Sequence, residues 1–168
     1  ALHAVGQGFE KGTLFLPQLL MSADAAKSSF EVIRQFFLKS GTAEEKKGKI
    51  ILATVKGDIH DIGKNIVKVL LENYGYEVLD LGKDVSPERI VEETVKEQAP
   101  LVGLSALMTT TVANMEETIR LLKKKVPGCR VMVGGAVLTE EYARSIGADF
   151  YGKDAMASVR YAESLFAK

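Results

Sequence analysis

Short apolar runs rich in β-branched residues alternate with amphipathic segments from residue 49 onward. Five such runs predict buried strands, at 50–55, 76–82, 101–107, 130–135 and 148–152. The intervening segments predict helices, at 62–73, 87–98, 111–125, 139–146 and 154–167. Helix-start signals support two of them, because Ser86 precedes Pro87 and Thr139 precedes two glutamates. Five strand–helix units are too few for an eight-fold barrel, so we predict an α/β fold with an open, doubly wound, five-stranded parallel sheet.

The first 38 residues have a different pattern, without strand alternation. Apolar residues recur in steps of three and four between Leu16 and Phe37, which predicts a helix with one apolar stripe. Glycines interrupt the segment before it and indicate a helix end and a turn. Residues 39–48 are polar and charged, as is typical of a linker. We therefore expect a helical domain at 1–38, a linker at 39–48 and an α/β domain at 49–168.

Composition narrows the function classes. The 168 residues include 22 Lys and Arg and 22 Asp and Glu, so the formal net charge is zero. Without a basic stretch, we expect neither nucleic acid nor an anionic membrane as a partner. The single cysteine, Cys129, excludes an internal disulfide framework and fits a reducing compartment. With no signal-peptide layout and no apolar run near the ~20 residues of a membrane span, we expect a soluble, cytoplasmic protein.

The loop after the first strand carries the most distinctive chemistry. Ligands of open α/β sheets bind beyond the carboxyl ends of the strands, where this loop lies. It reads Gly57-Asp58-Ile59-His60-Asp61-Ile62-Gly63. A neutral imidazole is a common metal ligand, and a carboxylate on its other nitrogen fixes its tautomer. Taken by itself, the D-x-H-x-x-G pattern favours a solvated loop in which Asp61 caps the next helix and His60 bonds to backbone, because so short a match is common by chance.

Two further loops at this edge are unusual. The loop 105–111 holds four hydroxyl side chains, of Ser105, Thr109, Thr110 and Thr111. Either a threonine caps the following helix, or the hydroxyls line a ligand site. After the fourth strand, Gly134-Gly135 indicates either a tight turn or a position where something bulky packs.

Taken together, these loops resemble the vitamin B12-binding signature. The matching residues are G-D-x-H-D-x-G-K-N at 57–65, S-x-L-x-T-T at 105–110 and the glycine pair. Their order and spacing are similar to the cobalamin module of methionine synthase and to the small corrinoid proteins of methyltransferase systems. Phe9-x-x-Gly-x-x-Phe15-Leu16-Pro17-Gln18 resembles the helical cap of those proteins. The resemblance implies a flavodoxin-like, cobalamin-binding domain preceded by a helical-bundle cap that lacks its N-terminal part.

The resemblance also implies a role for individual residues. His60 would be the lower axial ligand to cobalt, replacing the cofactor's dimethylbenzimidazole, whose nucleotide tail would enter the sheet. Asp58 would hold the far nitrogen of His60, and Thr111 would complete a proton relay. The other implied cofactor contacts are Gly57, Asp61, Ile62, Gly63 and Leu107; Ser105, Thr109, Gly134, Gly135, Tyr151, Gly152 and Ala155 around the tail; and Phe9 and Leu16 over the upper, methyl-bearing face.

The function implied is that of a corrinoid methyl carrier. Its cofactor would be cobalamin or a related corrinoid, alternating between methylcobalamin and Co(I) cobalamin. The methyl group would pass from a substrate-specific methyltransferase to an acceptor methyltransferase on the tetrahydrofolate, homocysteine or coenzyme M side. A reductive activator is a further implied partner. The chain would not turn over by itself.

Alternative functions share part of this pattern. The B12-binding subunit of an adenosylcobalamin-dependent mutase has D-x-H-x-x-G but lacks a cap like residues 9–18. A cobalamin storage or delivery protein could use the same pocket without turnover. A flavodoxin-like electron carrier requires a hydroxyl- and glycine-rich phosphate loop after the first strand, and a receiver domain requires an aspartate at the end of the third. Neither feature is present at those positions.

Overall fold

A computed structural model describes residues 46–167 and, in the N-terminal segment, residues 5, 7–9, 11–15, 17–19, 21, 22 and 25. Its centre is a parallel sheet of β1 (Lys49–Thr54), β2 (Glu77–Asp80), β3 (Leu101–Ser105), β4 (Arg130–Gly134) and β5 (Phe150–Tyr151). The strand order is β2-β1-β3-β4-β5. The chain therefore reverses its direction of travel across the sheet between β1 and β3, as predicted for an open doubly wound fold.

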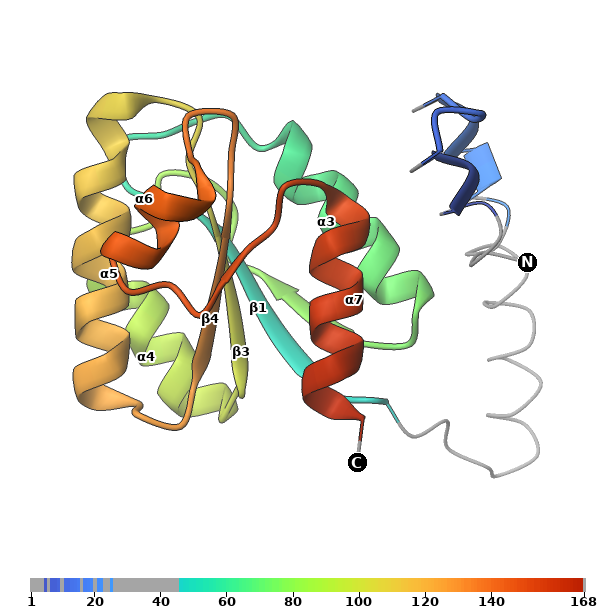
Figure 1. The fold of residues 1–168 in the computed structure, drawn as a ribbon. Coiled ribbons are helices and arrows are strands. Elements are labelled where there is room, and N and C mark those ends of the chain that lie inside the picture. Colours follow the sequence, from blue (N-terminus) through green and yellow to red (C-terminus); the bar gives the residue numbers. More distant parts are fainter. Residues whose placement is uncertain are drawn as a thin grey trace.

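Helices cover both faces of the sheet (Figure 1). One face carries α3 (Ile62–Asn73) and α7 (Ala155–Phe166), which pack against each other. The other carries α4 (Pro87–Glu97), α5 (Val112–Lys125) and the short α6 (Glu140–Ser145). A single 3₁₀ turn, η1 (Thr109–Thr111), leads into α5. All five predicted helices of the α/β domain are confirmed.

Alternation along the strands divides the core into two clusters. In β1 and the residue after it, Ile51, Ala53 and Val55 pack toward α4 and α5, whereas Ile50 and Leu52 pack toward α3 and α7. Buried Leu19 and half-buried Phe9 from the N-terminal segment are grouped with the second cluster. The residues of 1–48 that the structure describes thus contribute apolar contacts on the side of α3 and α7.

Four strands, β2 to β5, are shorter than predicted, and for β3 and β5 the hydrogen bonds show a physical reason. β3 stops at Ser105 rather than residue 107, because the N–H groups of Leu107 and Met108 turn to the Asp58 carboxylate. β5 has two residues instead of five. Asp149, just before it, donates its backbone N–H to the Val131 carbonyl, but Val131 N donates to the Asp149 carboxylate, where a regular ladder would use a backbone carbonyl.

The ends of the helices show which sequence signals were correct. Ser86 accepts from Arg89 N at the start of α4, and Thr139 accepts from Tyr142 N at the start of α6, as predicted. Asp61 lies at the N-cap of α3 but makes no side-chain capping bond, so its predicted capping role is wrong. No helix in the described part of the chain combines the length and apolarity needed to cross a membrane.

Candidate cofactor-binding site

The carboxyl ends of the central strands bring the predicted loops to one edge of the sheet (Figure 1). The loop 55–61 leaves β1 next to the loop that leaves β3, because these two strands are paired in register. Val55 N also donates to the Ser105 carbonyl at 3.1 Å, which continues the ladder past the end of β1. The sequence motifs at 57–65 and 105–110 therefore share one site.

Asp58 is the centre of this site. Its side chain is fully buried, and its carboxylate accepts five hydrogen bonds or polar contacts from two loops. Oδ1 is 3.0 Å from His60 N and 2.8 Å from His60 Nδ1. Oδ2 accepts from Leu107 N at 2.6 Å, Met108 N at 3.2 Å and Thr111 Oγ1 at 3.0 Å. The carboxylate therefore joins the loop after β1 to the loop after β3.

These contacts also set the charge of Asp58. Burial by itself raises the pKa of the carboxyl, because it removes water from the charged form. Hydrogen bonds from His60 N, Leu107 N, the His60 ring and Thr111 outweigh burial and hold the pKa well below its usual range. Asp58 is therefore a buried carboxylate that stays ionised in the folded protein.

His60 is held on one side only. Because an ionised carboxylate can only accept, the contact with Asp58 assigns a hydrogen to Nδ1 and, in the neutral ring, leaves a lone pair on Nε2. The side chain remains 46% exposed, and Nε2 has no hydrogen-bond partner among the described residues. The backbone-bonded alternative is wrong for the ring, which bonds to a side chain. His60 thus presents an oriented nitrogen donor to an incoming group.

Thr111 does not cap the helix that follows it. It lies at the N-cap of α5, yet its side chain makes no capping bond there. Its hydroxyl is 3.0 Å from Asp58 Oδ2 and 2.8 Å from the Met108 carbonyl. A hydroxyl has one hydrogen, so only one of these acceptors receives it at a time. Thr109 and Thr110 form the exposed part of η1.

Exposed apolar side chains accompany the imidazole. Ile59 is 63% exposed, Ile62 77% and Leu107 41%, although all three belong to the loops that hold Asp58 and His60 or directly follow them. Aliphatic side chains are normally buried, and a cluster of them on the surface marks an interaction site. The nitrogen donor is therefore set among apolar groups that suit a flat, largely apolar ligand.

The loops after β4 and β5 are closely packed. A Cβ at Gly135, which has φ +143°, would lie 1.7 Å from the Ala106 carbonyl oxygen. A Cβ at Gly134 would lie 3.3 Å from the Gly152 carbonyl oxygen. In this structure the glycine pair therefore accommodates neighbouring backbone. Nearby, the Tyr151 hydroxyl donates to the Leu138 carbonyl at 2.9 Å.

The remaining predicted residues form no hydrogen bond with His60 in the part of the chain that the structure describes, or lie outside that part. Ser105 ends β3 and is half-buried, and Ala155 begins α7. Phe9 is half-buried in the N-terminal segment, whereas Leu16 lies outside the described residues. The predicted contacts of both with a corrin remain predictions.

Two anchors of the loop were not identified from the sequence. Lys64, whose side chain is 2% exposed, is 2.5 Å from Asp80 Oδ1 and ties the first turn of α3 to the end of β2. Asp84 accepts from Gly57 N at 2.7 Å. Lys64 is part of the G-K-N sequence that ends the motif, so its position in the motif was the one available indication of a role. Its partner Asp80 could not be predicted, because the contact depends on how β2 lies beside β1 in the sheet.

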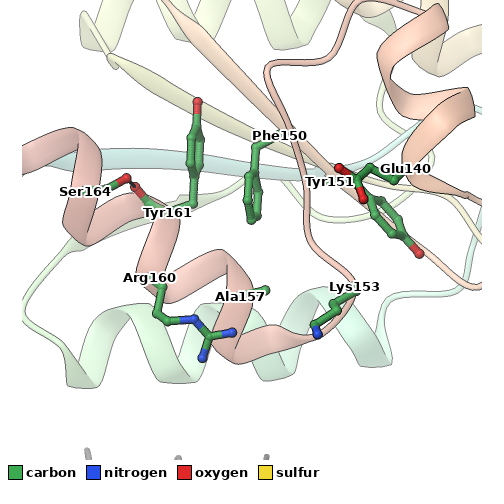
Figure 2. Close-up of a pocket in the computed structure, with 8 residues that line it drawn as sticks. All are labelled: Glu140, Phe150, Tyr151, Lys153, Ala157, Arg160, Tyr161 and Ser164. Atoms are coloured by element: carbon green, nitrogen blue, oxygen red, sulfur yellow. Dashed lines mark hydrogen bonds between the residues drawn. The ribbon is translucent and has the colours of Figure 1, made fainter.

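A separate groove of about 530 Å³ lies at the outer edge of the sheet (Figure 2). Phe150 and Tyr161 form a stacked pair there, with ring centroids 4.3 Å apart. The groove is lined by Glu140, Phe150, Tyr151, Lys153, Ala157, Arg160, Tyr161 and Ser164. It includes Tyr151 from the predicted tail site but neither Asp58 nor His60.

The comparisons with known proteins agree with the fold and with the class of cofactor that the motifs predict. Residues 48–160 match the B12 binding domain family, and residues 1–34 match a second family also described as a B12 binding domain. The fold and site define a cobalamin-binding α/β protein. More specifically, this chain belongs to the corrinoid proteins of methyltransferase systems.

Individual relatives support that assignment. Dimethylamine corrinoid protein 3 of Methanosarcina mazei is 42% identical, over 99% of this chain and 100% of the relative. Dimethylamine corrinoid protein 1 of Methanosarcina acetivorans is also 42% identical, over 99% of this chain and 78% of the relative.

Solved structures show the same architecture. The methanol:cobalamin methyltransferase complex MtaBC from Methanosarcina barkeri contains a chain 32% identical, with a TM-score of 0.86, covering 99% of this chain and 63% of that one. A cobalamin-binding protein from Desulfitobacterium hafniense is 33% identical, with a TM-score of 0.83, covering 97% and 77% respectively.

Proposed function

We propose that this protein binds cobalamin with the nucleotide base displaced and His60 as the lower cobalt ligand, and carries a methyl group between two methyltransferases. The observation that carries the proposal is the pairing of His60 with Asp58. One ring nitrogen is 2.8 Å from a buried carboxylate, while the other is available at the site edge. A carboxylate behind a metal-bound imidazole fixes its orientation and increases its basicity.

The described residues fit such a cofactor in two respects. First, the donor set contains one oriented imidazole, which suits a metal whose other ligands come from its own macrocycle. Second, exposed Ile59, Ile62 and Leu107 offer aliphatic contact for the face of a corrin. The small residues that end β3 and β4, Ser105 and Gly134, are neighbours in register and suit insertion of a nucleotide tail.

The chain's own residues control the ligand atom. When bound, cobalamin supplies a cobalt–carbon bond through which a methyl group is accepted and released. Asp58 keeps the hydrogen of His60 on Nδ1 and thereby keeps Nε2 as the donor atom. A proton reaching the ring at Nε2 removes that donor, so the protonation of the Asp58–His60 pair determines whether His60 can ligate. Thr111 supplies a hydroxyl hydrogen to the same carboxylate.

The relatives support the proposed partners. One solved relative is part of a methanol:cobalamin methyltransferase complex, and others are named dimethylamine corrinoid proteins. We propose that one partner is a substrate-specific methyltransferase for a small methylated compound. The other is an acceptor methyltransferase on the tetrahydrofolate, homocysteine or coenzyme M side, and a reductive activator restores the carrier after adventitious oxidation.

Electron paramagnetic resonance of the Co(II) cobalamin complex tests the proposed ligation. Protein labelled with ¹⁵N-histidine should give the splitting of one ¹⁵N nucleus, and His60→Ala should abolish it. His3→Ala is the matched control, since His3 is the only other histidine, and it should leave the spectrum unchanged. A spectrum in which the dimethylbenzimidazole nitrogen stays coordinated would contradict the proposal. Methyl transfer from a donor methyltransferase then separates a carrier from a storage protein.

A further inference from the structure

Thr54, the last residue of β1, has a buried hydroxyl that the fold does not use. The residue is 0% exposed, and its Oγ1 has no hydrogen-bond partner in the part of the chain the structure describes. Leaving a buried polar group unpaired is costly, and such groups are rare in folded proteins. An apolar residue of similar size, valine, would avoid this cost. The presence of threonine therefore indicates a hydrogen-bond partner supplied by a bound molecule.

The sheet register shows where this hydroxyl lies. Thr54 is paired with Ser105 on β3, and Ser105 with Gly134 on β4, so the three form one row across the ends of neighbouring strands. Alternation places Thr54 on the same face as Ile50 and Leu52, toward α3 and α7. Neighbours in register on a parallel sheet direct their side chains to the same face, about 4.8 Å apart. Thr54 is thus the most deeply buried member of the row that the proposed function assigns to the nucleotide tail.

We propose that the Thr54 hydroxyl is a further polar contact for the nucleotide tail of bound cobalamin, beside Ser105. This inference rests on the proposed function. The tail carries several acceptors, namely the free nitrogen of the displaced base, the ribose oxygens and the phosphate oxygens. Gly134 has no side chain that would obstruct the tail, and Ser105 is only half-buried. Thr54 is the next residue along the row and is fully buried. The tail thereby supplies the acceptor that Thr54 lacks in the fold itself.

Access to Thr54 involves the first turn of α3. This helix is the next element after β1 along the chain, and it packs against β1 on the face that carries Thr54. The buried contact of Lys64 with Asp80 ties that turn to β2. To reach Thr54, the tail would have to enter between the sheet and α3, along the row from Gly134 to Thr54.

Thr54→Val tests the inference with two ligands. Cobalamin carries the nucleotide tail, and aquacobinamide has the same corrin without it. The variant should lose about 3- to 10-fold in cobalamin affinity, the range of one hydrogen bond, and none in aquacobinamide affinity. In the absence of either ligand, its thermal midpoint should be equal to or above that of the wild type, because an unpaired hydroxyl has been removed.

Thr94→Val is the matched control. Thr94 is equally buried, but its hydroxyl donates to the Ile90 carbonyl at 2.6 Å, so it should affect neither ligand. An unchanged ratio of cobalamin to cobinamide affinity in Thr54→Val would overturn the inference. A lower thermal midpoint without ligand would also overturn it, because the hydroxyl would then have a structural partner. If wild-type protein binds cobalamin without histidine coordination, the proposed function fails instead.

Discussion

The Asp58 carboxylate lies 2.8 Å from Nδ1 of His60 and is itself fully buried, whereas the His60 side chain is 46% exposed. A buried carboxylate thus orients an imidazole ring that is partly exposed to solvent. The two loops that Asp58 joins are 49 residues apart in sequence at the Leu107 contact. The orientation of the ring is therefore maintained by the fold of the sheet and not by the local loop alone.

Asp58→Asn should reverse the tautomer of His60. An amide can donate to Nδ1, and this places the ring hydrogen on Nε2, where it blocks coordination. We expect a loss of about 10- to 100-fold in cobalamin affinity, as for other partners of metal-bound histidines. The absorption spectrum of the methylated form should shift toward that of the form without histidine ligation.

A carboxylate outside the site gives a control for this variant. Asp61 is itself an implied cofactor contact, so the control is Glu117 on α5, whose carboxylate is exposed and paired with Arg120; Glu117→Gln should keep both the spectrum and the affinity. Equal spectra for wild type and Asp58→Asn between pH 5 and 9, about the range in which histidine ligation titrates, would remove Asp58 from the proposed role.

The stability of the protein without cofactor should depend on Asp58 in acid. Burial raises the pKa of Asp58, but hydrogen bonds from His60, Leu107 and Thr111 lower it further, to well below an unfolded aspartate. The stabilisation of the folded state by ionised Asp58 is therefore complete above about pH 5 and declines as the pH falls toward the folded pKa of Asp58. Between pH 7 and pH 3 the wild type should lose about 1 kcal/mol more unfolding free energy than Asp58→Asn. Urea unfolding at the two pH values measures this difference, and equal losses would contradict it.

The sequence was sufficient to predict the alternation of strands and helices, because buried parallel strands are continuous apolar runs. The family motif also singled out Asp58, His60 and Thr111, whose side chains the structure brings into contact. The sequence did not identify Thr54 or the Lys64–Asp80 contact. Both depend on which strands are neighbours, and strand order is a property of the whole fold. The shortened β3 was missed for the same reason, since its N–H groups turn to a residue on another strand's loop.

Gly135→Ala should destabilise the protein strongly. Its φ of +143° disfavours any side chain, and an added Cβ would lie 1.7 Å from the Ala106 carbonyl oxygen. We expect a loss of about 2–5 kcal/mol in unfolding free energy, from strain and steric overlap together. Gly128→Ala is the control, because nothing lies within 4 Å of its Cβ position. Equal stability of the two variants would show that the loop after β4 can relax.

Phe9→Ala tests the predicted cap. If Phe9 covers the upper face of the corrin, the variant should retain cobalamin, because the tail contacts lie in the α/β domain. Photolysis of the methyl–cobalt bond should become faster, since the methyl radical would escape before recombining. Phe15→Ala is the matched control, since Phe15 is 70% exposed. Reduced stability of Phe9→Ala with an unchanged photolysis rate would instead make Phe9 an ordinary core residue.

The Thr111 hydroxyl has two acceptors at nearly equal distances, Asp58 Oδ2 at 3.0 Å and the Met108 carbonyl at 2.8 Å. Rotation about the Cβ–Oγ1 bond moves the hydroxyl hydrogen from one acceptor to the other without displacing any heavy atom. When the Asp58–His60 pair gains positive charge, the hydrogen can turn away to Met108, and when the charge is lost it can return. Under the proposed function, Thr111 would change its hydrogen-bond acceptor as the Asp58–His60 pair gains or loses a proton, while the loops stay in place.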